Sequence, residues 1–339
     1  LFAQWQGKNE GFTKGRDRSF HFGTNEHKIV GMISHLGPQM GVACGIALSN
    51  KLKNNNQVTA VFTGDGGTSQ GDFHEALNLA STWSLPVIFC IENNGYGLST
   101  PVKEQYAIEN LADRGDSYGI ESHIIDGNNI IDVYSCVKSV VENMRKDSKP
   151  VLIEFKTFRI KGHEEASGQA YIDESIIEKW AKKDPISHFK LFLLKSKYLS
   201  KKEMDAINAS TSKEIDQNWS SANSYKEVDF NIENELGDVY KEHNEGKSEP
   251  KDESLREVRL VDSIKDGIYE SMEQHDNLVI MGQDIAEYGG VFKVTDGLFD
   301  KYGKNRVLNT PLCESVILSS AYGLSVGGYK SIVEMQFAD

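Results

Sequence analysis

The sequence of 339 residues lacks several features that mark particular classes of protein. It contains no apolar run long enough to span a membrane and no recognisable secretory signal peptide. Basic residues are outnumbered, with 37 lysines and arginines against 50 acidic residues, and the net charge is −13. An acidic chain of this kind is poorly suited to nucleic acid or anionic membrane surfaces, so we expect neither as a partner.

Cysteine is also scarce, and its spacing gives no sign of metal or redox chemistry. None of the four cysteines forms a C-x-x-C pair, and most stand in apolar surroundings: Cys44, Cys90, Cys136 and Cys313. Zinc sites and disulfide frameworks require paired spacings, which are missing here. We therefore expect reduced thiols in the protein core and a cytoplasmic location.

Two common phosphate-binding patterns are missing as well. The sequence has no G-x-x-x-x-G-K-[ST], and the run GDGGTS lacks the final glycine of a dinucleotide-binding fingerprint. The two best-known phosphate-binding motifs that place a glycine-rich turn after a strand therefore fit this sequence poorly. The turn in GDGGTS therefore needs another explanation.

The stretch from Gln57 to Thr100 predicts a strand, a helix and a second strand. Apolar runs at 58–62 and 87–91 flank a segment with apolar residues at helical spacing: Phe73, Leu77, Ala80 and Trp83. Runs that are apolar throughout are typical of parallel strands buried on both faces. Because ligands of open parallel sheets bind at the carboxyl ends of strands, we expect Asp65 and Asn94 at one ligand-binding edge.

Oxygen groups at these two strand ends favour a magnesium–phosphate site. Asp65 offers a carboxylate, Asn94 an amide oxygen, and the turn at Tyr96 a backbone carbonyl. Mg²⁺ prefers oxygen ligands and usually keeps phosphate oxygens in its shell. Glycines beside the carboxylate allow a phosphate to approach the backbone: Gly64, Gly66 and Gly67. Either turn alone is equally consistent with an ordinary tight turn, whereas the pair within one strand–helix–strand unit is far more specific.

Helical patterns frame this stretch on both sides. Pro38 suits the first turn of a helix, and apolar residues follow it at helical spacing: Met40, Cys44, Ala47 and Leu48. Residues 174–220 are expected to be helical, with Ser200 as an N-cap and Glu203 completing a capping box. Residues 106–119, by contrast, have the pattern of a polar loop.

The motifs resemble those of thiamine-diphosphate-dependent enzymes. GDG, a helix and then NN is similar to their cofactor motif. The longer runs GDGGTSQGDFHEALNLA and IENNGYGLST resemble the alpha subunit of the first component of 2-oxo acid dehydrogenases. This resemblance implies that Asp65, Asn94 and the Tyr96 carbonyl hold the Mg²⁺ that anchors the diphosphate of thiamine diphosphate.

Four further positions acquire roles from the same resemblance. Ser34 and the Leu36 backbone match a loop that contacts the aminopyrimidine ring of the cofactor. Arg159 and His163 follow a strand expected at 151–158 and match residues that contact the diphosphate and the reacting carbon. From the residues alone, the first segment is as readily an ordinary loop entering a helix, and the second is more often a solvated loop than a site.

A second unit is expected from Leu255 onward. The runs GQDIAEYGGVFKVTDGL, NTPLCESV and GGYKSIVEMQFAD resemble the beginning of the beta subunit of the same component. Glu314 opens a helix after a strand-like run at 307–311, and a glutamate there is by itself most often a charge favoured by the helix dipole. The resemblance implies that Glu314 is a catalytic carboxylate that hydrogen-bonds the aminopyrimidine, with His163 as a second catalytic residue.

The expected architecture is α/β. A doubly wound parallel sheet of the thiamine-diphosphate-binding fold is followed by the start of a second α/β, pyrimidine-binding domain. We predict an alpha-like domain at 1–220, a polar and acidic linker at 221–254 and a beta-like domain at 255–339. The resemblance further implies alpha and beta segments fused in one chain that is truncated at both ends.

The function implied by the resemblance is oxidative decarboxylation of a 2-oxo acid, with acyl transfer to the lipoyl domain of a dihydrolipoyl acyltransferase core. The runs TPLCE, GGVFK and EMQFAD favour the branched-chain (2-oxoisovalerate) type over the pyruvate type. A homo-oligomer, such as a dimer of fused chains, is expected. Two alternatives stay open: a pyruvate-type, acetoin-type or transketolase-like relative, and a chain without catalytic activity that acts only in assembly or core binding.

Overall fold

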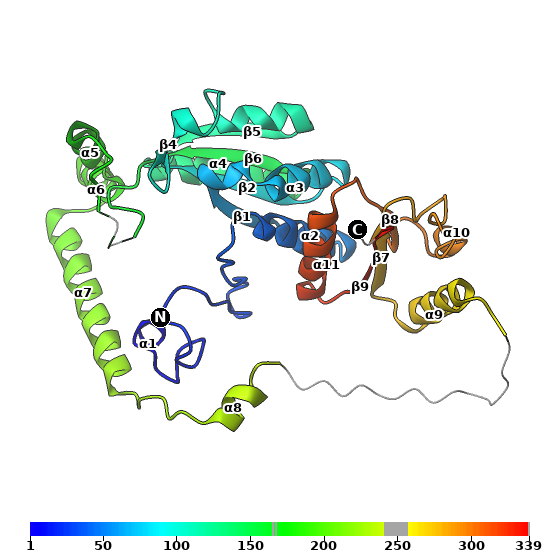
Figure 1. Ribbon diagram of the computed structural model, residues 1–339. Helices are drawn as coiled ribbons and strands as arrows, with labels where there is room; N and C mark the ends of the chain where they lie inside the picture. The colour runs from blue at the N-terminus through cyan, green and yellow to red at the C-terminus, as the bar shows by residue number, and fades with distance from the viewer. Residues whose placement is uncertain (165, 167, 241–256, 338–339) are drawn as a thin grey trace. The chain divides into compact units, whose positions relative to one another are not determined.

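The computed structural model describes residues 1–164, 166, 168–240 and 257–337, and the chain forms two compact units (Figure 1). The smaller unit combines Leu1–Ser34 with Lys197–Val258, and the larger combines His35–Ser196 with Arg259–Asp339. All four cysteines are free, and three of them are buried as expected. Within the described ranges, no helix has the length and apolar character needed to cross a membrane.

The larger unit contains a four-stranded, wholly parallel sheet in the order β1-β2-β6-β5. Its strands are β1 (Thr59–Gly64), β2 (Val87–Asn93), β5 (Glu121–Asp126) and β6 (Val151–Lys156). Helix α3 (Gly71–Thr82) connects β1 to β2, and α4 (Ile130–Met144) connects β5 to β6. The predicted doubly wound α/β fold is confirmed.

Strand β2 is buried on both faces, whereas β1 is buried on only one. Phe89 packs towards α3, and its neighbour Cys90 packs into a second cluster with Val140 of α4. On β1, Val61 is 7% exposed and Phe62 is 57% exposed. The prediction of two buried faces is therefore wrong for β1. The reason is its place at the edge of the sheet, where the cluster around α4 includes Val58, just before the strand, but does not reach Phe62.

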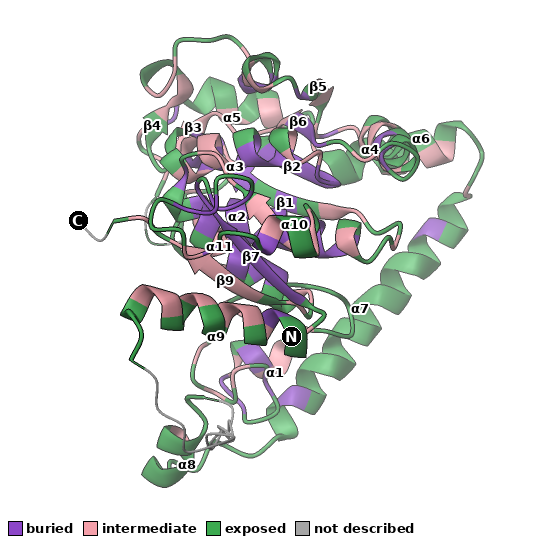
Figure 2. Ribbon diagram, turned by 90° about the vertical axis from the view of Figure 1, so that its right-hand side faces the viewer, coloured by how far each residue is buried: buried purple, intermediate pink, exposed green. Residues whose placement is uncertain are grey.

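A second parallel sheet, in the order β8-β7-β9, belongs to the same unit. Its strands are β7 (Leu278–Gly282), β8 (Val307–Asn309) and β9 (Lys330–Glu334), and its helices are α9 (Leu260–Gln274), α10 (Leu298–Tyr302) and α11 (Glu314–Val326). Every residue of the central strand β7 is buried (Figure 2). Helix α11 begins at Glu314, as the sequence predicts.

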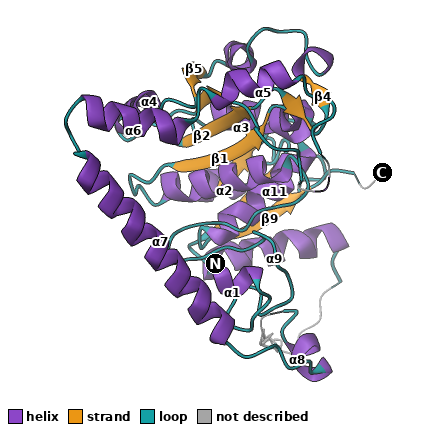
Figure 3. Ribbon diagram, turned by 90° about the vertical axis from the view of Figure 1, so that its left-hand side faces the viewer, coloured by secondary structure: helices purple, strands orange, loops and turns teal. Residues whose placement is uncertain are grey.

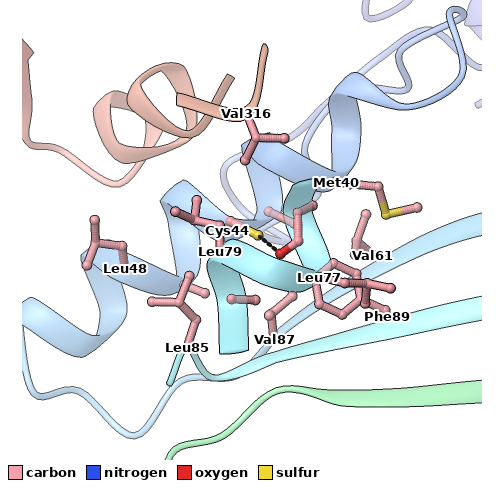
Figure 4. Packing of buried hydrophobic residues seen from close by; sticks show 14 of the residues in the cluster. Met40, Cys44, Leu48, Val61, Leu77, Leu79, Leu85, Val87, Phe89 and Val316 are labelled. Carbon is pink, nitrogen blue, oxygen red and sulfur yellow. Dashed lines mark hydrogen bonds between the residues drawn. The ribbon is translucent and has the colours of Figure 1, made fainter. Parts of the chain in front are cut away.

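Close packing of α2 (Pro38–Leu52) against α11 joins the two sheets. A Cβ on Gly45 would lie 1.9 Å from the carbonyl oxygen of Ser320, and one on Gly323 would lie 2.0 Å from that of Val42. Only glycine permits backbones this close. Both helices contribute to one apolar cluster with β1 and β2 (Figure 4), which includes Met40, Cys44, Val61, Phe89 and Val316.

Short elements complete the larger unit. The strands β3 (Tyr96–Gly97) and β4 (Thr100–Pro101) form a hairpin. The described residues also contain three 3-10 helices: η1 (Gly66–Ser69), η2 (Val102–Glu104) and η3 (Leu111–Tyr118). Helices α5 (Glu174–Ala181) and α6 (Pro185–Lys195) follow β6 in the sequence and belong to the segment of the larger unit that ends at Ser196.

The described part of the smaller unit contains α1 (Phe2–Trp5), α7 (Lys201–Ser224) and α8 (Ile232–Gly237) (Figure 3). The predicted capping box at the start of α7 is present. Arg16 forms ion pairs with Glu235 at 2.6 Å and Asp238 at 2.8 Å. The first part of the predicted linker thus carries regular structure. Residues 241–256 lie outside the described residues, and the domain boundaries stay a prediction.

Replacing Gly45 with alanine is expected to destabilise the larger unit by about 1–3 kcal/mol, the usual range for overpacking. The added Cβ meets backbone atoms of α11, which cannot rotate away. Gly267→Ala in the exposed interior of α9 is the matched control, because a Cβ there meets nothing within 4 Å. It should raise stability by about 0.5–1 kcal/mol through helix propensity. Urea unfolding followed by circular dichroism measures both, and equal stability of the two variants would contradict the tight packing.

Candidate active site

Asp65 lies directly after β1, and its side chain is fully buried. Parallel pairing sets Gly64 opposite Glu92, so the loops that follow β1 and β2 leave the sheet side by side. The backbone N–H of Asn94 donates a hydrogen bond of 3.3 Å to Asp65 Oδ1. The structure therefore brings both predicted oxygen ligands to one edge of the sheet. Their role as metal ligands stays a prediction.

The three predicted glycines differ in how closely the surrounding atoms approach them. A Cβ on Gly67 would lie 2.2 Å from a hydroxyl oxygen of β1, and one on Gly66 would lie 3.1 Å from the Cα of Gly97. Gly64 has more room, since its nearest neighbour would be 4.0 Å away. The first two residues of η1, directly after Asp65, therefore carry no side chains. Close approach of a phosphate to the backbone requires this.

The Asp65 carboxylate is electrostatically unfavourable where it stands. Burial raises the pKa of Asp65 above its ordinary value of 3.8, and the hydrogen bonds from Gln105 and Asn94 and the charge of Arg159 oppose this. Gln105 Nε2 donates to Asp65 Oδ2 at 3.1 Å and to the carbonyl of Thr100 at 3.0 Å. The sequence analysis missed Gln105, because a single glutamine in a loop belongs to no recognisable pattern.

A buried network of hydrogen bonds holds the residues next to Asn94 and Gln105. The fully buried Glu154 on β6 accepts from Asn93 Nδ2 at 2.6 Å and from the Ala112 N–H at 2.9 Å. Asn93 also donates to the hydroxyl of Tyr106 at 3.0 Å, and burial raises the pKa of Tyr106 to about 12. The prediction of a polar loop at 106–119 is thus wrong, because these bonds and the buried start of η3 pack the segment against the sheet.

The loops after β2 and β6 bring three further predicted residues together. Asn94 Oδ1 accepts the Tyr96 N–H at 3.1 Å, and an amide oxygen retains a second lone pair for another partner. Arg159 Nη2 donates to the carbonyl of Leu98 at 2.6 Å, and Nη1 lies 3.5 Å from His163 Nδ1. Residues from three neighbouring parallel strands therefore converge at the predicted edge.

Glu314 occupies the first position of α11, and its side chain is exposed. Gln283 Nε2 donates to Glu314 Oε1 at 2.9 Å, and this hydrogen bond is the main cause that lowers the pKa of Glu314. A hydrogen bond joins the first turn of α11 to α3. In it, the Val316 N–H donates to Glu75 Oε2 at 3.1 Å. Glu314 is thus held as a charged acceptor.

The N-terminal ends of α2 and α11 both meet the first turn of α3. Ser315 Oγ in α11 donates to Asp72 in α3. A Cβ on Gly37, which precedes α2, would lie 2.6 Å from Asp72 Oδ2. Leu36 is exposed just before this glycine. Leu36 and Glu314, predicted from distant parts of the chain, therefore lie at helix ends that converge on α3.

Ser34 belongs to the smaller unit. Its hydroxyl oxygen lies 2.6 Å from His21 Nε2. No sequence pattern pointed to this contact, and the side chain of Ser34 is exposed to solvent.

Residues 1–231 match the family described as Dehydrogenase E1 component, and residues 256–339 match the family described as Transketolase, pyrimidine binding domain. The chain belongs to the dehydrogenase E1 family. Both families imply thiamine diphosphate as the cofactor. The donor set fits this cofactor, because a buried carboxylate, a neighbouring amide oxygen and a backbone free of side chains stand together.

Individual relatives are alpha subunits of several enzymes. The chain is 39% identical over 196 residues to the alpha subunit of acetoin:2,6-dichlorophenolindophenol oxidoreductase of Bacillus subtilis, which covers 58% of the chain and 59% of the relative. It is 39% identical over 194 residues to the mitochondrial 2-oxoisovalerate dehydrogenase alpha subunit of Caenorhabditis elegans (56% and 44%). A pyruvate dehydrogenase E1 alpha subunit of Rickettsia typhi is 32% identical over 215 residues (63% and 66%). The chain thus spans 44–66% of the length of these three relatives.

The raised pKa of Asp65 predicts a pH dependence of stability. A carboxylate whose folded-state pKa is raised opposes folding at neutral pH, and this penalty disappears as the pH falls through the folded pKa towards 3.8. The stability of Asp65→Asn relative to the native chain should therefore be greater at about pH 7 than at about pH 4.5. Melting temperatures at both pH values test this. Asp113→Asn, which changes an exposed carboxylate, should show no such trend, and the same flat result for Asp65→Asn would contradict the argument.

Proposed function

We propose that the chain acts in the thiamine-diphosphate-dependent decarboxylation of a 2-oxo acid and that Mg²⁺ binds at the edge of the first sheet. The observation that carries the proposal is the fully buried Asp65 beside the Asn94 amide. Burial raises the pKa of this carboxylate, and a bound divalent cation would remove that penalty. The proposed ligands are the side-chain oxygens of Asp65 and Asn94 and the carbonyl oxygen of Tyr96.

Gln105 supports this assignment. Its amide donates to Asp65 Oδ2 and neighbours Gly66 and Gly97. An N–H donor at this position partly neutralises the buried carboxylate, as a cation would do more completely. The proposal therefore assigns to Gln105 the role of satisfying the carboxylate when no metal is present.

The remaining site residues divide between binding and proton transfer. Thiamine diphosphate, when bound, supplies the carbanion-stabilising chemistry that decarboxylation needs. Arg159 and His163 place hydrogen-bond donors at the sheet edge for the diphosphate and the substrate. Glu314 supplies a charged acceptor for a ring nitrogen of the aminopyrimidine, since the hydrogen bond from Gln283 favours its ionised form.

The proposed substrate is a branched-chain 2-oxo acid, and the proposed acceptor is the lipoyl group of a dihydrolipoyl acyltransferase core. The motifs TPLCE and GGVFK support this type. The proposal also takes alpha-like and beta-like parts to be fused and to assemble as a homo-oligomer. An acetoin-type activity is the second candidate, because identity to the acetoin-type relative is the same 39%. Turnover of 3-methyl-2-oxobutanoate, pyruvate and acetoin would decide between these types.

Binding of thiamine diphosphate should require Mg²⁺, and Asp65→Asn should abolish that requirement together with most of the affinity. Loss of the carboxylate removes the one anionic ligand of the proposed metal set. Isothermal titration of the chain with thiamine diphosphate, with and without Mg²⁺, measures this, and Asp113→Asn serves as the control. Binding by Asp65→Asn that still depends on Mg²⁺ would exclude the metal assignment. No binding by the native chain would favour a role in assembly alone.

Glu314→Gln should bind the cofactor normally but lower the decarboxylation rate by about 10²- to 10⁴-fold, the usual value of one proton-transfer group. Glutamine keeps the size of the side chain and one acceptor oxygen but lacks the negative charge. The rate with 3-methyl-2-oxobutanoate and the cofactor affinity are measured in parallel. Glu270→Gln, an exposed carboxylate on α9, is the control. Weak cofactor binding by Glu314→Gln would instead indicate that Glu314 anchors the cofactor.

A further inference from the structure

Arg114 lies in η3 and reaches the turn that directly follows Asp65. Its Nη1 donates to the carbonyl of Thr68 in η1 at 2.6 Å. Thr68 is in turn bound to Asp65, since its hydroxyl donates to the Asp65 carbonyl at 2.7 Å and its N–H donates to the same oxygen at 3.2 Å. Both residues are fully buried. The guanidinium is therefore connected to the backbone of the buried carboxylate residue through a single turn of the chain.

A second set of contacts connects Arg114 to the same carboxylate. The guanidinium carbon lies 5.9 Å from the ring centre of Tyr106, whose hydroxyl accepts from Asn93 Nδ2 at 3.0 Å. The residue before Tyr106 is Gln105, which donates to Asp65 Oδ2 at 3.1 Å. Arg114 thus contacts both segments that hold Asp65: the turn bound to its backbone and the segment that supplies a donor to its side chain.

The backbone on both sides of Arg114 is fixed by buried contacts. Before it, the Ala112 N–H donates to the fully buried Glu154 at 2.9 Å. After it, a Cβ on Gly115 would lie 1.9 Å from the hydroxyl oxygen of Ser122 on β5, so only glycine permits this approach. Arg114 therefore extends from a segment that is packed against the sheet, and its side chain has a fixed point of origin.

The guanidinium keeps its charge although burial opposes it. Burial is the main cause that lowers the pKa of Arg114, but an arginine stays protonated at neutral pH. Two aromatic rings lie close to the cation, since the ring centre of Phe73 is at the same distance of 5.9 Å as that of Tyr106. A hydrogen bond from a charged donor is roughly twice as strong as one between neutral groups. The bond to the Thr68 carbonyl is accordingly stronger than the neutral bonds within the turn.

We propose that Arg114 is a positioning residue for metal binding, which holds η1 and the segment before η3 so that the Asp65 carboxylate stays in place beside Asn94. The inference rests on the proposed function, because the metal is taken to be the Mg²⁺ that accompanies thiamine diphosphate. Arg114 is assigned no contact with either ligand. Mg²⁺ demands near-ideal octahedral geometry at short distances, so a carboxylate that can shift binds it more weakly.

Amide hydrogen exchange tests the positioning role without any ligand. Arg114→Met removes the donor and the charge but keeps an apolar stem against the two rings. The Thr68 amide should then exchange about ten- to hundredfold faster than in the native chain, the effect of losing a hydrogen bond from a charged group. Amides in the centre of β2 should keep their native rates. An unchanged rate at Thr68, or an equal acceleration in β2, would overturn the proposal.

The Mg²⁺ requirement of cofactor binding tests the consequence for the site. The probe is thiamine diphosphate, titrated into the full chain at a series of Mg²⁺ concentrations. Arg114→Met should raise the Mg²⁺ concentration of half-saturation by about 10- to 100-fold, the usual effect of losing a residue that supports metal ligands. The cofactor affinity at saturating Mg²⁺ should stay nearly unchanged. Arg114→Lys keeps a cationic donor but not the planar guanidinium, so its Mg²⁺ requirement should lie between the two.

Two further variants sharpen this measurement. Thr68→Val removes the hydroxyl bond to the Asp65 carbonyl and keeps the shape of the side chain, so it should raise the Mg²⁺ requirement even where Arg114→Met does not fold. Arg145→Met is the matched control, because Arg145 Nε also donates to a backbone carbonyl, that of Asn56 at 3.2 Å, but belongs to neither segment that holds Asp65. It should behave as the native chain.

The outcomes separate the positioning role from the proposed function. A native Mg²⁺ requirement in folded Arg114→Met would overturn the positioning role and leave the proposed function untouched. A loss of cofactor affinity that persists at saturating Mg²⁺ would show that Arg114 acts otherwise than through Asp65, and it would also overturn the positioning role. Failure of the native chain to bind thiamine diphosphate at any Mg²⁺ concentration would overturn the proposed function and, with it, the role assigned to Arg114.

Discussion

The close approach of α2 and α11 is the constraint on which the larger unit depends. The two helices join the four-stranded and the three-stranded sheet through glycines where backbone meets backbone, and they share one apolar cluster with β1 and β2. This contact also fixes the positions of the helix ends. Since α2, α3 and α11 share one packed core, their N-terminal turns meet, and Leu36, Asp72 and Glu314 gather there. Packing in the core therefore sets the geometry of residues that the sequence places far apart.

A second constraint is the buried carboxylate of Asp65. An ionised group at zero exposure is unfavourable unless its charge is balanced, and the structure answers with two neutral donors, Asn94 and Gln105. The Glu154 network holds the segment that precedes η3 and so keeps Gln105 near the carboxylate. The buried charge of Asp65 lowers the stability of the fold, and it lies where the sheet edge, the glycines of η1 and Arg159 come together. A destabilising group of this kind is expected where residues serve binding rather than stability.

Sequence patterns predicted those features that depend on short-range periodicity. Parallel strands around one helix, the adjacency of Asp65 and Asn94, and the start of α11 at Glu314 all follow from local rules, and the structure confirms their placement. Sequence patterns did not predict the features that depend on neighbours in space. The exposure of Phe62 follows from the edge position of β1, and neither Gln105 nor the His21–Ser34 contact belongs to a spaced motif. These residues acquire their roles only through packing between distant segments.

The two carboxylates of the candidate site stand in opposite environments. Burial raises the pKa of Asp65, while a hydrogen bond from Gln283 lowers that of exposed Glu314. A carboxylate that is destabilised by burial gains most from a bound cation, because the cation removes an existing penalty. A carboxylate that is stabilised in its ionised form instead offers a constant charged acceptor for a ring nitrogen. The proposed function assigns anchoring to the first sheet and activation to the start of α11, and the opposite environments of the two carboxylates support that proposal.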